Sequence, residues 1–296
     1  MVAKRMRMKR VLKELDMRPT EGQLMRDVIE GMQARGQNVT EAEVENEVFS
    51  LEVLQELVEP IDNANDLDKM GGLDEVIVRT ASKHATIRAA AYQVIGTASS
   101  NNDMVQKQIL DKGALHQFAR QLQVETDVDV RVKAIFAIGV VSRNSETARQ
   151  VLYDENLLEL LLDLMDTDDT RLRRKSVLLL TDFFSRDPQA FFAKITALDN
   201  LVRPLVAIVA GTREDDLDLR EKAMIALQSM LLLPQEVANT VDAIRGSDIA
   251  RAMATLARDL DVAEAEDDSL AEYFADIRAY IVDISKILDG SVSGEL

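Results

Sequence analysis

Apolar residues recur at helical spacing along most of the chain, and two stretches share one pattern. Residues 87–102 read IRAAAYQVIGTASSNN, and residues 130–145 read VRVKAIFAIGVVSRNS. Each begins with an aliphatic residue and Arg, continues with Ala, Ile and Val at helical intervals, and holds a glycine at the same place, Gly96 and Gly139. This spacing predicts a long amphipathic helix that occurs more than once.

The pattern continues further along the chain. Arg88, Arg131, Arg173 and Arg220 each open such a helix, at intervals of 43, 42 and 47 residues. A period of about 40–47 residues is typical of armadillo and HEAT repeats. The sequence therefore predicts an all-α chain, an armadillo/HEAT-like right-handed superhelical solenoid of about four repeats with helical caps. We expect the first three of these arginines to form ion pairs between repeats.

Shorter apolar segments separate the long helices. Gly113 and Asn156 stand where a residue in the left-handed conformation would end the helix in such a segment. Asp and Thr residues precede the long helices and suit the N-cap position. We therefore expect two or three helices in each repeat.

The predicted organisation of the whole chain has four parts. Residues 1–60 form a helical N-terminal cap, with a turn at residues 18–20, a helix that ends near Gly36 and an amphipathic helix over residues 41–58. Residues 61–260 form the repeats, residues 261–290 hold a C-terminal capping helix, and residues 291–296 form a disordered tail. The acidic stretch DVAEAEDDS, residues 261–269, is expected to be a linker before the last helix.

The two glycines need a physical reason, because glycine inside a helix costs about 0.5–1 kcal/mol relative to alanine. One interpretation is a shallow concave surface that a partner approaches closely, and the other is tight packing between neighbouring helices. Thr181 and Gln228 stand at this register in the later repeats, and both are small or polar. We expect the long helices to line an extended concave face.

Composition narrows the classes of partner. The formal net charge is −17, so we expect no nucleic-acid partner, because neutralising phosphates needs Lys and Arg. The exception is the basic start MVAKRMRMKR, which we interpret as a solvated helix start or tail. No apolar run approaches the ~20 residues of a membrane-spanning helix, so we expect no membrane partner.

The sequence does not indicate catalytic or metal chemistry. Cysteine is absent, and the only histidines, His84 and His116, belong to no HExxH or other metal-ligand pattern. The GxxxxGK[ST], GxGxxG and GxSxG motifs do not occur. We therefore expect no enzyme, and no catalytic, metal-binding or cofactor-binding residues.

Residues 61–77, IDNANDLDKMGGLDEVI, form the most specific motif of the chain. A second motif follows at residues 88–102, which share several residues with the sequence pattern of a protein family. The shared residues are Arg88, Ala91, Val94, Ile95, Gly96, Thr97, Ala98, Asn101 and Asn102. Together the two segments resemble the Fes/Sil family of nucleotide exchange factors for heat-shock protein 70 (Hsp70) chaperones. The next repeat also resembles that family, with Gly139 in place of a commoner Ser. The resemblance runs from about residue 41 to residue 235 and thins after residue 190.

The resemblance implies a co-chaperone that clasps the ATPase domain of an Hsp70 chaperone, BiP-type or cytosolic, and promotes ADP release. We expect it to act as a monomer. Residues 8–35 and 273–288 look more like the luminal Sil-type branch, which implies the endoplasmic reticulum lumen and a leader missing from this chain. The alternative location is the cytoplasm.

The residues that we predict to contact the partner lie on the long helices, along the expected concave line. They are Tyr92, Gly96, Ile135, Gly139, Arg143, Asn144 and Thr181. Tyr92 is the first choice, because aromatic residues are enriched among binding hot spots. Ordinary packing between repeats is the alternative role for Tyr92.

Two other functions stay open. A general armadillo adaptor would bind an extended peptide or protein partner, and such arrays usually carry a ladder of Trp and Asn on the concave face. This chain has no Trp, which counts against that function. An enzyme with an unrecognised site is the third possibility.

Overall fold

The structure, a computed structural model, describes residues 19–195, 197–211, 216–234 and 239–290. The basic start of the chain and residues 291–296, which we predicted to be a tail, lie outside these residues. The described residues form α- and 3-10 helices without strands, and they divide into two compact units, Met1–Asn144 and Ser145–Leu296. The boundaries of cap and repeats that we expected stay predictions.

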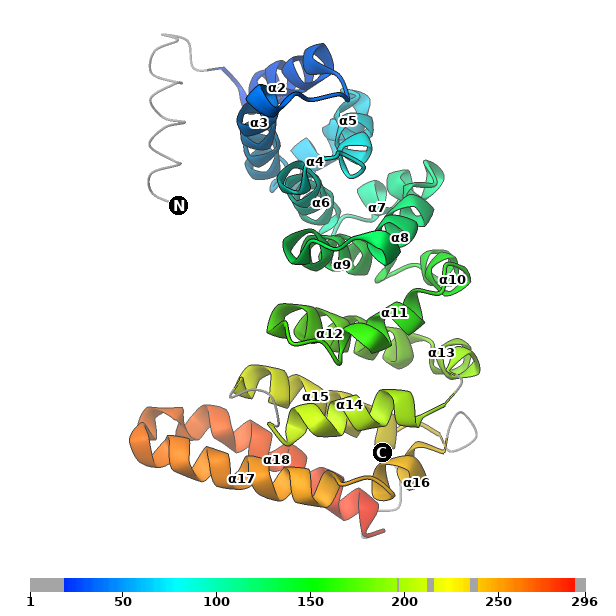
Figure 1. Ribbon diagram of the computed structural model, residues 1–296, viewed down its shortest axis with the longest axis vertical. Helices are drawn as coiled ribbons and strands as arrows, with labels where there is room; N and C mark the ends of the chain where they lie inside the picture. Colours follow the sequence, from blue (N-terminus) through cyan, green and yellow to red (C-terminus); the bar gives the residue numbers. More distant parts are fainter. Residues whose placement is uncertain (1–18, 196, 212–215, 235–238, 291–296) are drawn as a thin grey trace. The chain divides into compact units, whose positions relative to one another are not determined.

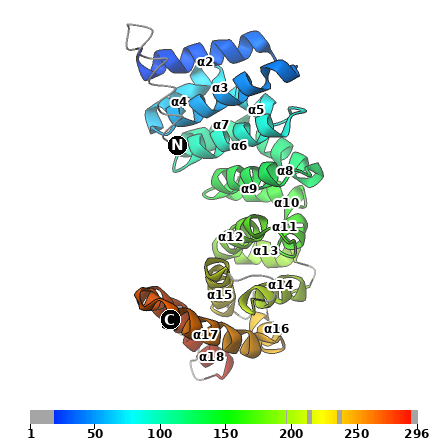
Figure 2. The same cartoon turned by 60° about the vertical axis from the view of Figure 1, so that its left-hand side comes forward.

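Unit 1 opens with a helical pair and continues with two triplets. The pair is α2 (Glu21–Arg35) and α3 (Val44–Leu57), with the short helix η1 (Glu41–Glu43) between them. The triplets are α4 (Ile61–Lys69), α5 (Gly72–Arg79) and α6 (Ala85–Ser99), then α7 (Asp103–Asp111), α8 (Ala114–Val124) and α9 (Val128–Ser142). Helix α6 packs against both α3 and α9, so these three helices lie side by side, as Figure 1 shows, and Figure 2 shows α2 along α3.

Unit 2 repeats the triplet order. Its helices are α10 (Glu146–Asp154), α11 (Leu157–Leu164) and α12 (Thr170–Arg186), then α13 (Pro188–Lys194), α14 (Asp199–Val209) and α15 (Leu217–Leu231), then α16 (Thr240–Arg245), α17 (Ile249–Glu266), η2 (Asp268–Leu270) and α18 (Ala271–Leu288). Helix α15 packs against α12 and α18. The described residues thus form five triplets, where the sequence predicted about four repeats.

Several helix ends follow the sequence signals. Gly113 and Asn156 have φ values of 67° and 55°, which confirms the left-handed ends predicted for α7 and α10. Thr20 caps α2 through a reciprocal bond with Gln23, and Gly36 ends that helix, as predicted. The predicted linker at residues 261–269 is wrong in its first part, because α17 continues to Glu266. Ala and Glu favour the helix there, and no Gly or Pro interrupts it.

The repeated arginines tie the second helix of each triplet to the third. In four triplets the guanidinium donates to a backbone carbonyl at or just beyond the end of the second helix, where carbonyls lack helical partners and cations are favoured. The bonds join Arg88 Nη1 to Ser82 O (2.8 Å), Arg131 Nε to Glu125 O (2.5 Å), Arg173 Nε to Met165 O (3.3 Å) and Arg220 Nε to Val209 O (2.9 Å). Sequence analysis missed these carbonyl bonds.

One predicted ion pair between repeats is present in unit 1. Arg88 forms a two-pronged pair with Glu125 of the next triplet, with nitrogen–oxygen distances of 2.6 and 2.9 Å. Burial alone would raise the pKa of Glu125, but the hydrogen bonds from Arg88 and from backbone N–H groups hold this pKa below its ordinary value. The pair therefore connects α6 to the end of α8.

Gly96 sits where α9 crosses α6. A Cβ at this position would lie 2.2 Å from the Phe136 ring, far closer than any real contact. Glycine therefore lets Phe136 of α9 rest against the backbone of α6. For Gly96, the structure favours the tight-packing interpretation over the open-surface one.

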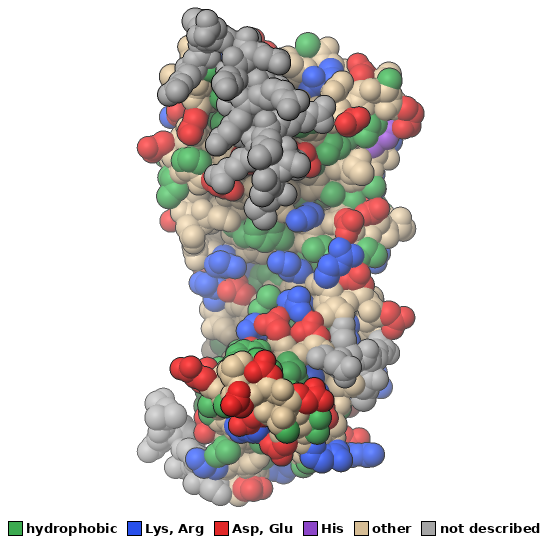
Figure 3. Space-filling view, turned by 90° about the vertical axis from the view of Figure 1, so that its left-hand side faces the viewer, with side chains coloured by type: hydrophobic (Ala, Val, Ile, Leu, Met, Phe, Trp, Pro, Cys, Tyr) green, Lys and Arg blue, Asp and Glu red, His purple; other side chains and the backbone are tan. Residues whose placement is uncertain are grey.

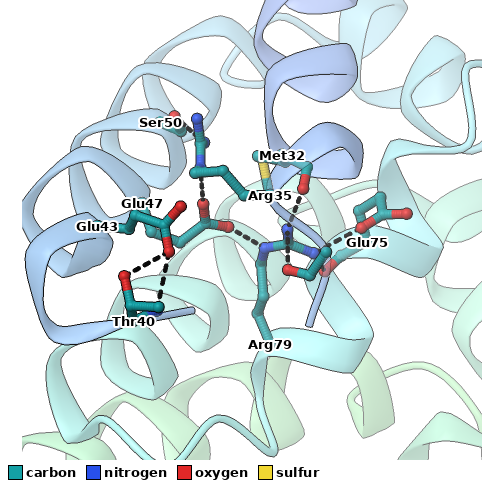
Figure 4. Close-up of polar contacts among 9 residues, drawn as sticks. Met32, Arg35, Thr40, Glu43, Glu47, Ser50, Glu75 and Arg79 are labelled. Atoms are coloured by element: carbon teal, nitrogen blue, oxygen red, sulfur yellow. Dashed lines mark hydrogen bonds and ion pairs between the residues drawn. The ribbon is translucent and has the colours of Figure 1, made fainter. Parts of the chain in front are cut away.

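A buried ion cluster holds the start of unit 1 together (Figure 4). The Glu47 carboxylate on α3 is fully buried and accepts hydrogen bonds from Arg35 of α2 and from Arg79 of α5. Arg79, 2% exposed, also donates to the backbone oxygen of Met32 and to Glu75. The Glu47 carboxylate thus connects three helices. The buried charges of Glu47 and Arg79 are paired with each other, as burial requires.

We expect Glu47→Gln to lower the free energy of unfolding by about 3–5 kcal/mol, because it leaves two guanidinium groups without their shared counter-charge. Urea unfolding followed by circular dichroism measures the change. The control is Glu56→Gln on the exposed side of the same helix, which should change stability by less than about 0.5 kcal/mol. Equal effects from both variants would contradict a structural role for the cluster.

We expect Gly96→Ala to destabilise the protein by about 1–3 kcal/mol, because the added methyl group must displace the Phe136 ring. The control is Gly22→Ala in α2, where no atom lies within 4 Å of the added Cβ. Helix propensity alone should make that variant neutral or slightly more stable. A Gly96→Ala protein as stable as the parent would mean that α6 and α9 adjust freely.

Candidate protein-interaction surface

The outward faces of α3, α6 and α9 form an open groove in unit 1, with a volume of about 360 Å³. Its floor on α6 is shallow, because Ala89 and Ala90 have the shortest side chains after glycine. The lining residues are Val48, Leu51, Glu52, Gln55, Ala85, Thr86, Ala89, Ala90, Gln93, Asp127, Asp129 and Lys133. These residues come from three helices that pack side by side, so the groove crosses several repeats.

Polar groups are fixed along this groove. Lys133 Nζ donates to Gln93 Oε1 at 2.6 Å, and Gln93 Nε2 donates to Thr97 Oγ1 at 3.3 Å. The Asp127 carboxylate accepts from the backbone N–H of Val130 at 3.0 Å and so caps α9. These bonds place an ammonium group and a carboxylate at defined points of the rim, where they can select a partner by charge.

Three predicted contact residues are buried instead of exposed. Tyr92 is 1% exposed, stacks edge-on against Phe118, and donates its hydroxyl proton to Gln121 at 2.7 Å. Burial raises the pKa of Tyr92, which keeps the hydroxyl protonated. Ile135 is 2% exposed, and Gly96 lies under Phe136. The cause is helical register, since the faces of α6 and α9 that carry Tyr92, Gly96 and Ile135 are turned towards the core of unit 1.

The other predicted residues reach the surface to different degrees. Arg143 and Asn144 are exposed at the end of α9, and Gly139 is half-buried. In unit 2, Thr181 is half-buried and donates to the backbone oxygen of Val177 at 2.7 Å. The partner-binding role of all seven residues stays a prediction.

Sequence analysis missed the residues that line the groove. Ala89, Ala90 and Gln93 lie beside Tyr92 on α6 but point outwards. A usable signal was present, because Gln93 and Lys133 are polar residues with mostly apolar neighbours in the sequences of α6 and α9. Polar residues on a helix whose other faces are apolar mark its exposed side.

Unit 2 has an open groove of its own, of about 850 Å³, among α14, α16 and α17. Arg203 and Arg251 line it together with Asp199, Asp242 and Asp248, so its charges are mixed. Elsewhere in this unit, large apolar side chains are exposed on the long helices or directly after one: Leu178, Leu232 and Tyr273. Figure 3 shows acidic side chains gathered where α17 ends and α18 begins.

The described residues contain no group of three or more His, Asp or Glu that could hold a metal ion. Within the same part of the chain, none of the helices combines the length and apolarity that crossing a membrane requires. The candidate site of unit 1 is an open groove on three packed helices.

Known proteins support both the fold and the family. A designed armadillo repeat protein in complex with the peptide (KR)4 has the same fold, with a TM-score of 0.67 and 14% identity, covering 88% of this chain and 99% of that one. The structure thus defines an armadillo-type repeat protein. The family model "Nucleotide exchange factor Fes1" matches residues 2–67, and the model "SIL1/FES1/HPBP1 C-terminal domain" matches residues 63–199. Residues 2–199 of this chain thus match the SIL1/FES1/HPBP1 family over two consecutive family models.

This chain matches only part of the length of its curated relatives. Hsp70-binding protein 1 of Rattus norvegicus is 31% identical over 190 residues, which are 64% of this chain and 52% of that protein. Nucleotide exchange factor Sil1 of Drosophila melanogaster is 27% identical over 167 residues, 55% of this chain and 39% of that protein. The chain thus spans about half the length of the curated relatives it matches, or less.

The structure shows which side chains are exposed to water. Single cysteine substitutions can measure this exposure, because the chain has no cysteine of its own. We expect Gln93→Cys to react with a thiol reagent at least ~100-fold faster than Ile135→Cys, which must wait for local opening. Urea should abolish the difference. Equal rates in the folded protein would show that the register of α6 and α9 is not as described.

Proposed function

We propose that this protein is a nucleotide exchange factor that binds the ATPase domain of an Hsp70 chaperone and promotes ADP release. The observation that carries the proposal is the match of two consecutive family models, one of them named for nucleotide exchange, over residues 2–199. Relatives named for Hsp70 binding and for nucleotide exchange support it. We also propose that the protein is not an enzyme and that it acts as a monomer.

The physical mechanism is preferential binding. A factor that binds the open, nucleotide-free chaperone more tightly than the closed form shifts the chaperone towards the open form. By thermodynamic reciprocity, ADP then weakens the binding of the factor by the same ratio. A tenfold change in nucleotide affinity needs only about 1.4 kcal/mol of such preference. Rigid helical surfaces suit this role, and no catalytic side chain is needed.

We propose the α3–α6–α9 groove of unit 1 as part of the contact surface. It crosses three packed helices, and its floor is made of small residues, so a partner can approach the helix backbone closely. Arg143 and Asn144, exposed at the end of α9, extend the surface within the same unit. The net charge of −17 favours a partner with a basic surface and speeds its association.

We further propose the endoplasmic reticulum lumen as the location, with the cytoplasm as the alternative. The sequence resemblance of residues 8–35 and 273–288 to the Sil-type branch supports the lumen. Relatives named Fes1, Sil1 and Hsp70-binding protein 1 all match this chain, so the chaperone that it serves has to be found by experiment.

Stopped-flow release of a fluorescent ADP analogue tests the proposal, with purified BiP-type and cytosolic chaperones in parallel. We expect the protein to accelerate release at least ~10-fold from one of them. Ala90→Arg, which fills the groove floor, should remove most of the acceleration. Ala265→Arg, an exposed alanine of α17 in unit 2, is the matched control and should remain active.

A folded protein that accelerates release from neither chaperone would refute exchange activity. Full activity of the Ala90→Arg variant would move the contact surface away from the groove. A second candidate function, an adaptor for an extended peptide, is favoured by the groove itself. It would be supported if a peptide library were retained by the protein while both chaperones were not.

A further inference from the structure

One exposed tripeptide of unit 1 has the sequence that secretory cells modify with sugar. Residues 38–40 read Asn-Val-Thr, which fits the acceptor pattern for N-linked glycans, Asn-x-Ser/Thr with any residue except Pro in the middle. No other asparagine of the sequence has Ser or Thr two residues later. A pattern this short also arises by chance, so the place of the asparagine in the fold has to decide.

The Asn38 side chain is exposed and takes no part in holding the fold. It lies in the loop between α2 and η1, outside any helix. In the part of the chain that the structure describes, its amide group makes no hydrogen bond. A glycan on the Nδ2 atom therefore replaces no contact of the folded protein, and it meets solvent rather than the core.

The loop is fixed on both sides of Asn38. Gly36 ends α2 with a φ value of 68°, and its backbone oxygen accepts a hydrogen bond from Arg79 Nη2 at 3.4 Å. Val39 is 2% exposed, and its backbone oxygen lies 3.3 Å from His84 Nε2. With Val39 turned into the unit, Asn38 beside it is turned outwards.

The hydroxyl group that the pattern requires is engaged once the chain has folded. Thr40 Oγ1 donates to Glu43 Oε2 at 2.6 Å, and the Thr40 backbone N–H donates to the same oxygen at 2.9 Å. These bonds form the cap at the start of η1. Modification therefore has to precede this cap, which is the order of events when a chain is modified as it enters the endoplasmic reticulum.

We propose that Asn38 carries an N-linked glycan. In the transfer, Asn38 Nδ2 forms a bond to C1 of the first sugar of a lipid-diphosphate-linked oligosaccharide. The bond from this carbon to the diphosphate oxygen breaks, the lipid diphosphate leaves, and the amide nitrogen loses one proton. The modification rests on the luminal location within the proposed function, but it does not depend on nucleotide exchange itself.

A glycan at this place also limits where a partner can bind. Asn38 is not among the residues that line the α3–α6–α9 groove, although His84 beside the loop directly precedes Ala85 and Thr86 of the groove. The glycan therefore covers the loop and leaves the groove open. A partner bound in the groove has to leave the α2–η1 loop free.

Expression of the full chain behind an added secretory leader in eukaryotic cells tests whether Asn38 is modified. We expect a product that migrates more slowly in gel electrophoresis and returns to its unmodified position after treatment with an amidase that removes N-linked glycans. This enzyme converts the carrier asparagine to aspartate, so peptide mass spectrometry identifies position 38. The same chain without a leader should stay unmodified.

Three variants show which residues the modification needs. Asn38→Gln should abolish the mobility shift, whereas Thr40→Ser should keep it, because serine also supplies the hydroxyl group. The matched control is Asn46→Gln, at an exposed asparagine of α3 outside the pattern, which should be modified like the parent.

A secreted chain that stays unmodified would overturn the proposal, and so would a glycan that persists in the Asn38→Gln variant. The protein purified from the cells in which it naturally occurs is the decisive sample, and an unmodified Asn38 there would also refute it. None of these readouts uses a chaperone, so they separate a failure of the modification from a failure of exchange activity.

The consequence for the partner has its own measurement. Removing the glycan from the folded, modified protein should change the acceleration of ADP release by less than about 2-fold, as expected for a residue outside the contact surface. A larger change would place the α2–η1 loop inside the contact surface and contradict this consequence.

Discussion

The fold depends on one repeated constraint, the junction between the second and third helices of each triplet. At each junction the last carbonyls of a helix lack partners and carry partial negative charge. An arginine from the following helix donates to one of these carbonyls in four triplets, in both units. A guanidinium suits this place because it keeps its charge and can make further bonds, as Arg88 does with Glu125.

With the junctions fixed, the contact between long helices decides how closely neighbouring triplets pack. In unit 1 this contact needs Gly96, because the Phe136 ring occupies the space of a side chain. The cost of glycine in a helix is thus offset by burial of an aromatic side chain in the packed interface. The same packing turns Ala89, Ala90 and Gln93 outwards and so creates the groove that we propose as a contact surface.

The start of unit 1 is held by charge as well as by apolar packing. Glu47 compensates Arg35 and Arg79 inside the unit, whereas Glu52 on the same helix faces the groove. Two carboxylates on one helix therefore have different roles, because five residues of separation place them on different faces.

The all-α class, the helix period, several helix ends and the resemblance to the family follow from the sequence alone, because these depend on local spacing, caps and motifs such as residues 61–77. The sequence did not determine which face of each long helix meets solvent. Tyr92 and Gln93 are neighbours, yet Tyr92 is buried and Gln93 lines the groove. Nor did it identify the partners of Arg79 or Gly96. Such contacts join residues about 30–40 positions apart, and only packing of the helices in space brings them together.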